Sequence, residues 1–161
     1  MSVVIIDYGI GNLNSVRRAF EESGADVLVS QNPENLASAS QIVLPGVGAF
    51  ADGMALLKEG SWIQATQEEV LENKTPILGI CLGMQLMADK GFEGGGYKGL
   101  GLIAGEVKRL EPHDPSIRIP HVGWNEIKGL SPIHLLKRFQ MEQTSTLSIA
   151  IILFLQVLRI Y

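Results

Sequence analysis

The first half of the chain alternates short apolar runs with stretches in which apolar residues recur at helical spacing. Apolar and β-branched runs predict strands at residues 3–7, 25–29, 41–44 and 76–80. Helical spacing predicts one helix from the N-cap Asn14 to Gly24 and others at 33–39, 62–71 and 82–89. This alternation is typical of βαβ units, so it predicts a mostly parallel sheet.

The second half of the chain follows a different pattern. A glycine-rich loop is expected at 91–99, and strand-like stretches follow at 101–110, 117–121 and 124–127 without helices between them. Consecutive strands without a crossover helix indicate antiparallel pairing. We therefore predict an open, doubly wound, flavodoxin-like α/β sheet that is mostly parallel and carries an antiparallel extension.

Composition narrows the functional classes. The 161 residues are 46% hydrophobic and 19% charged, which suits one globular domain and excludes a largely disordered chain. The net charge of −4 gives no sign of the excess basic charge that nucleic-acid-binding proteins carry. No signal peptide or membrane-length apolar run is evident, so we expect a cytoplasmic protein without membrane contact. The single cysteine excludes an internal disulfide and a cysteine-rich metal site, and we expect neither metal nor cofactor.

The strongest chemical signal surrounds that cysteine. Gly79-Ile80-Cys81-Leu82-Gly83 follows a predicted strand and opens a predicted helix, which is the Gly-x-nucleophile-x-Gly elbow with cysteine as the nucleophile. The sharp turn exposes the thiol at a helix N-terminus, where the helix dipole and free N–H groups favour a thiolate. The N–H of Leu82 is also expected to face a developing oxyanion. An ordinary buried cysteine at a strand end is the alternative.

A second signal lies at the end of the preceding strand. Pro45-Gly46-Val47-Gly48 is expected to form a loop at the carboxyl edge of the sheet, which is also where Cys81 falls. Its two glycines let backbone N–H groups approach a ligand closely, as an oxyanion hole requires. An ordinary Pro-Gly turn would also explain this loop. The loop therefore indicates an oxyanion hole only in combination with the neighbouring elbow.

Two other motifs leave alternatives open. His121, Trp124 and Asn125 lie beside a glycine in segment 120–125, and they suit either a partner surface or an ordinary core tryptophan with a hydrogen-bonded histidine. A Gly-x-Gly follows the first strand, as in a dinucleotide-binding fingerprint. However, Asn14 stands where the third glycine belongs, so the dinucleotide-binding fingerprint is incomplete.

Taken together, these segments resemble a known family. Residues 79–85 are similar to the nucleophile segment of class I, or triad, glutamine amidotransferases. Segments 7–13, 44–50 and 120–125 resemble the branch of that family formed by the glutaminase subunits of imidazole glycerol phosphate synthases, in histidine biosynthesis. The resemblance runs from residue 2 to about residue 132 in the right order and spacing.

The resemblance implies a specific reaction. Cys81 would attack the side-chain amide of glutamine, release ammonia and form a glutamyl thioester. The backbone N–H groups of Gly48 and Leu82 would stabilise the oxyanion, and Gln85 would line the glutamine pocket. Ammonia would pass to a (β/α)₈-barrel cyclase partner in a heterodimer, producing imidazole glycerol phosphate and an aminoimidazole carboxamide ribotide.

The family also implies a docking surface and a general base. Asn12, His121, Trp124 and Asn125 would lie toward the cyclase. The base and its orienting acid come from a His-x-Glu pair near the C-terminus in this family, yet neither His-x-Glu nor His-x-Asp occurs in the sequence. We therefore expect little or no glutaminase activity from the 161-residue chain.

The departure begins near residue 133. We expect an incomplete amidotransferase domain at 1–132 and an aberrant apolar tail at 133–161, which resembles a translation in a shifted frame. A divergent tail that packs as a helix or edge strand is the rival. Because the missing segment would supply sheet strands, we expect an unprotected sheet edge and marginal stability or aggregation. Three functions stay open besides the active glutaminase: a non-catalytic partner that docks on the cyclase, a different class I amidotransferase, and a cysteine-elbow hydrolase outside the amidotransferases.

Overall fold

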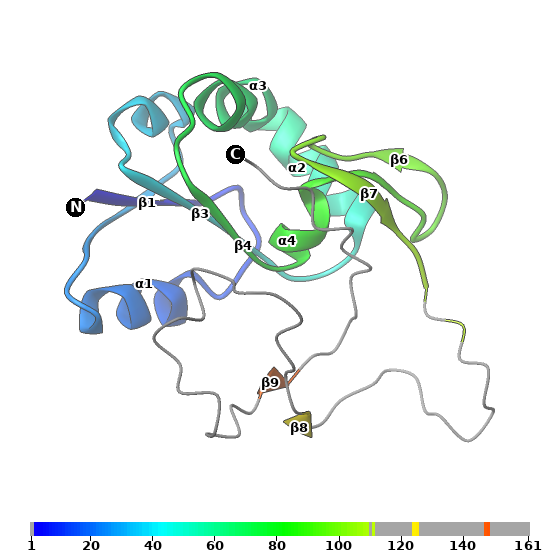
Figure 1. Cartoon of the computed structure of the whole chain (residues 1–161), viewed down its shortest axis with the longest axis horizontal. Helices are drawn as coiled ribbons and strands as arrows, with labels where there is room; N and C mark the ends of the chain where they lie inside the picture. Colours follow the sequence, from blue (N-terminus) through cyan, green and yellow to red (C-terminus); the bar gives the residue numbers. More distant parts are fainter. Residues whose placement is uncertain (1, 110, 112–123, 126–146, 149–161) are drawn as a thin grey trace, which may run out of the picture. The chain divides into compact units, whose positions relative to one another are not determined.

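The computed structural model describes residues 2–109, 111, 124–125 and 147–148. The chain divides into two compact units, of which the first contains residues 1–109 and the second residues 110–152. The first unit is an α/β structure, and it holds the predicted elbow (Figure 1).

A four-stranded parallel sheet forms the centre of the first unit. Its strands are β1 (Ser2–Ile6), β2 (Asp26–Ser30), β3 (Gln41–Gly46) and β4 (Ile77–Cys81), in the order β2-β1-β3-β4. Every pair is parallel, as the alternating pattern predicted. The two central strands are almost uninterrupted apolar runs because both faces of a doubly wound sheet are covered.

Helices cover both faces of this sheet (Figure 1). On one face, Leu13, Val16 and Phe20 of α1 (Leu13–Glu22) pack against Val3 and Ile5 of β1. The remaining elements contribute to the core on the other face: η1 (Pro33–Ser38), α2 (Phe50–Glu59), α3 (Trp62–Gln67), η2 (Glu68–Glu72) and α4 (Leu82–Leu86). The predicted doubly wound fold class is confirmed.

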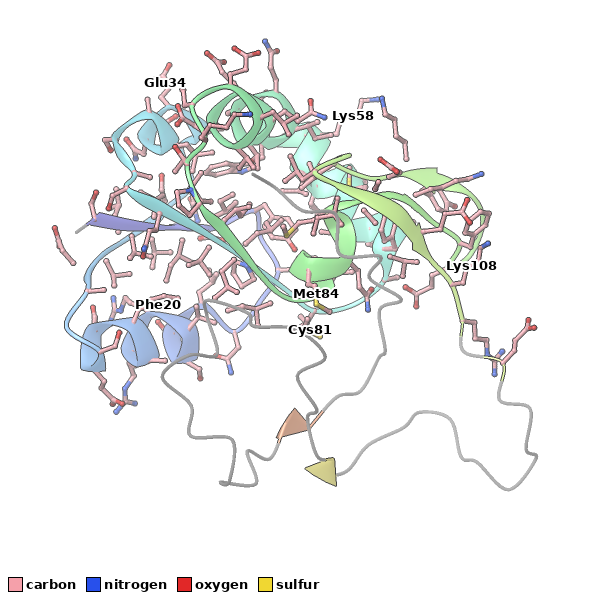
Figure 2. All side chains as sticks on the ribbon, in the orientation of Figure 1. Phe20, Glu34, Lys58, Cys81, Met84 and Lys108 are labelled. Atoms are coloured by element: carbon pink, nitrogen blue, oxygen red, sulfur yellow. The ribbon has the colours of Figure 1, made fainter. Side chains whose placement is uncertain are left out.

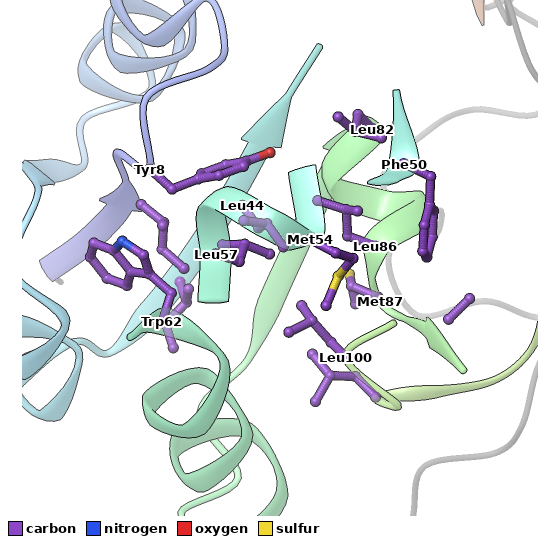
Figure 3. Close-up of a cluster of buried hydrophobic side chains, with 14 of the residues drawn as sticks. Tyr8, Leu44, Phe50, Met54, Leu57, Trp62, Leu82, Leu86, Met87 and Leu100 are labelled. Carbon is purple, nitrogen blue, oxygen red and sulfur yellow. The ribbon is translucent and has the colours of Figure 1, made fainter. Parts of the chain in front are cut away.

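Successive residues of the central strands serve the two cores alternately. Val4 and Ile6 join the larger core, which is built around the buried Trp62, Phe50 and Leu57 (Figure 3). This two-residue alternation is the ordinary geometry of a strand, and here both sets of positions are apolar.

The edges of the parallel sheet carry exposed leucines. Leu78 on β4 is 47% exposed and Leu28 on β2 is 45% exposed, although both belong to apolar strand runs. Among the described strands, β4 pairs with β3 alone, so its other side is an edge in this part of the chain.

A second, three-stranded sheet follows α4. It contains β5 (Ala88–Gly91), β6 (Tyr97–Lys98) and β7 (Ile103–Val107), in the order β6-β5-β7. β5 and β6 are antiparallel, but β5 and β7 are parallel. The extension is therefore a separate mixed sheet: the β5–β6 pair is antiparallel, as expected of the extension, and the β5–β7 pair is parallel. The expected loop at 91–99 contains β6.

Several boundaries differ from those the sequence predicts. The helix expected to reach residue 89 ends at Leu86, because the carbonyls of Leu86 and Ala88 accept backbone hydrogen bonds from Leu100 and Gly101, and β5 begins at Ala88. Asn12, not Asn14, is the N-cap of α1, since its Oδ1 accepts a hydrogen bond from the Ser15 N–H. The helix expected at 62–71 is present, but its last turn widens to a π-helix. Helix α2 was not predicted from the sequence.

The described part of the second unit is short. Strands β8 (Trp124–Asn125) and β9 (Leu147–Ser148) pair with each other in antiparallel fashion. The strand predicted at 117–121 and the domain boundary predicted at 132 lie outside the described residues. Within the described residues, no helix is long and apolar enough to cross a membrane.

Candidate active site

Cys81 occupies a strained turn between β4 and α4 (Figure 2). Its φ of 55° and ψ of −116° lie outside the regions that residues with a side chain adopt without strain. Such a conformation costs about 1–3 kcal/mol and persists only where the surrounding structure enforces it. The thiol is free and exposed. The strand, the sharp turn and the following helix are the structural context that the nucleophile elbow requires.

The flanking glycines make this turn sterically possible. A Cβ on Gly83 would overlap the carbonyl oxygen of Leu44 on β3. A Cβ on Gly79 would lie 2.5 Å from the Cα of Met84, one turn into α4. The absence of these two side chains therefore lets α4 fold back closely onto β3 and β4, which fixes Cys81 at the edge of the sheet.

The neighbouring strand end lies directly beside the nucleophile. Gly46 is the register partner of Cys81 and Pro45 that of Ile80, so both belong to β3 and not to the expected loop. The loop begins at Val47, which is 52% exposed, and continues through Gly48 at a φ of +100°. Only glycine adopts that φ readily. The structure thus brings the two predicted glycine motifs together at one edge.

The other two predicted site residues lie on α4. Leu82 is its first residue, and N–H groups in the first turn of a helix have no intrahelical acceptor. The helix has five residues, so its dipole contributes little and the individual N–H groups matter more. The Gln85 side chain is 3% exposed and lies inward. Its expected role in a glutamine pocket stays a prediction.

Glu93 stabilises the chain at this edge of the parallel sheet, and this role was not predicted from the sequence. Its Oε2 accepts a hydrogen bond of 2.9 Å from the backbone N–H of Phe50, the first residue of α2. A Cβ on Gly91 would lie 2.5 Å from the Phe50 ring, so the β5–β6 turn packs closely there. Loop residues Val47–Ala49 are therefore followed by an anchored helix start. No local pattern identifies a contact between residues 43 apart in the chain.

Replacing this carboxylate should destabilise the fold modestly. Glu93→Ala leaves the Phe50 N–H without its acceptor, and loss of a helix cap costs about 1 kcal/mol. Urea unfolding followed by circular dichroism measures the change. Glu93→Gln is the matched control, because its amide oxygen still accepts the bond and should retain more than half of the stability lost in Glu93→Ala. Equal losses in both variants would contradict this role for the hydrogen bond.

Tyr8 is the second residue that the sequence reading left without a role. It follows β1 at the same edge, is 5% exposed, and its buried hydroxyl has no hydrogen-bond partner among the described residues. A Cβ on Gly46 would overlap this hydroxyl. Burial raises the pKa of the phenol well above its usual value, and negative charge on Cys81 raises it further.

The residues expected at a partner surface are only partly described. The Asn12 side chain caps α1 through the Ser15 N–H. Trp124 and Asn125 form β8, and His121 lies outside the described residues. His113 and His134 also lie outside them, so the structure does not place a general base beside Cys81. The described side chains include no group of three or more His, Cys, Asp or Glu residues suited to hold a metal ion.

Comparison with known proteins identifies the family. The sequence matches the family described as "Glutamine amidotransferase class-I" over residues 4–144. The chain therefore belongs to the class-I glutamine amidotransferase family, as the elbow segment indicated.

Within that family, it is similar to subunits of one enzyme. It is 50% identical over 133 residues to imidazole glycerol phosphate synthase subunit HisH 1 of Campylobacter jejuni, covering 83% of this chain and 66% of that protein. It is 48% identical over 141 residues to subunit HisH of Zymomonas mobilis, covering 85% and 66%. The chain thus spans just under two thirds of these relatives. A crystal structure of a glutamine amidotransferase aligns with 55% of this chain and 46% of its own, at 19% identity and a TM-score of 0.49.

Proposed function

We propose that this protein is the glutaminase component of an imidazole glycerol phosphate synthase, with Cys81 as its nucleophile. The observation that carries the proposal is the strained Cys81 turn beside the end of β3. The family membership and the similarity to HisH subunits support the choice of glutamine and of this synthase. Following the biosynthetic role of such a synthase, we propose a cytoplasmic location.

In the proposed reaction, the Cys81 thiolate attacks the carboxamide carbon of glutamine. The electron pair moves to the amide oxygen, where the N–H groups of Gly48 and Leu82 stabilise the negative charge. When the tetrahedral intermediate collapses, the C–N bond breaks, and the leaving nitrogen takes a proton and departs as ammonia. Water then hydrolyses the thioester to glutamate and regenerates the thiol.

We propose that the ammonia is consumed by a (β/α)₈-barrel cyclase subunit bound to this chain. The names of the similar proteins, which call them subunits of the synthase, support a partner. Asn12, His121, Trp124 and Asn125 are the residues proposed to lie toward it, on the basis of the sequence resemblance. Gly46 and Val47 are proposed to shape the substrate side of the oxyanion loop.

A non-catalytic docking protein is the second candidate. It is favoured by one observation: the sequence has no His-x-Glu or His-x-Asp pair to supply the base and its orienting acid. Under this proposal the chain binds the cyclase and presents Cys81, but turns over glutamine slowly.

Competition for the cyclase tests the shared part of both candidates. The cyclase subunit of the Campylobacter jejuni synthase is labelled with a fluorophore and bound to its own HisH 1 subunit. The 161-residue chain is then added in increasing amounts, and we expect it to displace HisH 1. A chain that leaves this cyclase complex intact, but displaces the glutaminase of another class-I synthase, would show that the proposed partner is wrong.

A further inference from the structure

Tyr8 is held in a fixed position at the carboxyl edge of the parallel sheet. It directly follows Asp7, whose N–H donates a hydrogen bond of 2.8 Å to the Ser30 carbonyl. The Asp7 carboxylate accepts hydrogen bonds from the Gly9 N–H at 3.1 Å and from the Gln31 side chain at 2.7 Å. From this anchored turn, the buried Tyr8 ring extends across the larger core toward α4 (Figure 3). The contacts between the ends of β1 and β2 therefore fix the position of the phenol.

The Tyr8 hydroxyl fills the space that a side chain on Gly46 would need. A Cβ on Gly46 would overlap the hydroxyl oxygen. The same Cβ would lie 3.0 Å from the Gly83 nitrogen and 3.1 Å from the Leu82 Cβ. The hydroxyl thus lies against the last residue of β3, near the first two residues of α4. In a close-packed interior, an atom in this place keeps the strand end and the helix start apart.

The two elements that meet at this hydroxyl carry the two proposed oxyanion donors. Gly46 is the register partner of Cys81 and leads directly into residues 47–49, which include the Gly48 N–H. Leu82 begins α4 and has its own N–H beside the nucleophile. An oxyanion hole is effective when each donor lies about 2.7–3.1 Å from the charged oxygen. The separation between the end of β3 and the start of α4 must therefore be correct to a few tenths of an ångström.

We propose that Tyr8 is a positioning residue for the oxyanion hole: its hydroxyl is the spacer that sets the distance between the end of β3 and the first turn of α4. This inference rests on the proposed function, in which Gly48 and Leu82 are the oxyanion donors. The hydroxyl has no hydrogen-bond partner among the described residues, so its burial there is a cost to folding. A spacer acts through its volume, which accounts for a hydroxyl in this place.

Two reagents that modify Cys81, the only cysteine in the sequence, test this role. The thiolate adds to the carbonyl of the chloroketone analogue of glutamine, which places negative charge on the oxygen, before it displaces chloride from the neighbouring carbon. Iodoacetamide loses iodide directly and forms no oxyanion. Tyr8→Phe keeps the ring and removes the hydroxyl. In the full chain it should lower the second-order rate with the chloroketone about tenfold, and leave the iodoacetamide rate within about twofold, because only the first reaction needs aligned donors.

Tyr97→Phe is the matched control for the loss of a phenol hydroxyl. Tyr97 is exposed on β6 and its hydroxyl donates to the Gly94 carbonyl, so both rates should equal those of the parent chain. An unchanged chloroketone rate in Tyr8→Phe would overturn the proposal. An equal fall for both reagents would also overturn it, because such a fall reports on the sulfur and not on the oxyanion donors.

A double-mutant cycle tests the contact on which the proposal depends. Gly46→Ala should lower the midpoint of urea unfolding, because its Cβ overlaps the Tyr8 hydroxyl, and adding Tyr8→Phe should recover more than half of that loss. Should Gly46→Ala not fold, the double variant should restore a cooperative transition. Gly83→Ala is the control: its Cβ overlaps the Leu44 carbonyl, so Tyr8→Phe should not rescue it. Equal losses from Gly46→Ala with and without the hydroxyl would overturn the proposal.

The proposed function and the role of Tyr8 fail in different experiments. Chloroketone modification of the parent chain that glutamine does not slow would overturn the proposed function. Failure of Tyr8→Phe to rescue Gly46→Ala would overturn the role of Tyr8, even in a chain that glutamine protects. Tyr8→Phe by itself should not lower the urea midpoint, because it removes a buried hydroxyl without a partner among the described residues.

Discussion

With glutamine as substrate and the cyclase present, the 161-residue chain is expected to release glutamate about 10²–10⁴ times more slowly than the HisH 1 subunit of Campylobacter jejuni. The reason lies in the sequence: Cys81 stands in a strained elbow, but no His-x-Glu or His-x-Asp pair occurs in the 161 residues. Without such a pair, a thiol is deprotonated less often, and the departing ammonia lacks the proton donor that the pair supplies. Glutamate release is measured with a coupled dehydrogenase assay.

Added imidazole separates a missing base from a collapsed site. If the elbow is intact, imidazole in solution should raise the rate of the 161-residue chain and leave Cys81→Ser unaffected. The Campylobacter jejuni subunit serves as the positive control under the same conditions. Turnover by the 161-residue chain within about threefold of that subunit would contradict the expectation, because general base catalysis contributes far more than threefold.

The second large effect concerns the fold around the elbow. Gly83→Ala should lower the free energy of unfolding by about 3 kcal/mol, because the added Cβ overlaps the carbonyl oxygen of Leu44. The obstacle is backbone in a central strand and cannot rotate away. Either α4 moves away from β3 or the pairing of β3 with β4 is disturbed. Urea unfolding followed by tryptophan fluorescence measures the loss, since Trp62 is buried in the adjoining core.

Gly96→Ala is the matched control for this substitution. A Cβ there would meet only the far end of the Lys90 side chain, at 3.2 Å from its Cε, and that side chain can move. Its free energy of unfolding should stay within about 1 kcal/mol of the parent chain. Comparable losses for the two alanine variants would mean that close packing of α4 on β3 is not what Gly83 provides.

The elbow and the parallel strands were predictable because their signals are local. Five consecutive residues around Cys81 define the turn, and an uninterrupted apolar run identifies each central strand. Gly46 and Gly48 could be assigned to the same edge as Cys81 because all parallel strands present their carboxyl ends on one side. The alternating pattern also established which class of fold to expect.

The features that the sequence did not reveal depend on long-range contacts. α2 was missed because its apolar positions include Gly53 and Met54 in an otherwise mixed stretch, and their burial depends on packing. β5 was mistaken for helix because residues 86–88 are apolar in either structure, and only pairing with residues 100–103 decides between them. Glu93 matters through the Phe50 N–H, a partner that only folding brings close.

The most direct test of the account is whether Cys81 reacts as part of a glutamine site. The chloroketone analogue of glutamine is an electrophile that carries the substrate's own amino-acid group, and its adduct is located by mass spectrometry of the digested chain. The account predicts saturable modification of Cys81 alone, slowed by glutamine and not by D-glutamine. Modification that is slow, unsaturable and unaffected by glutamine would mean that the exposed thiol belongs to no glutamine site.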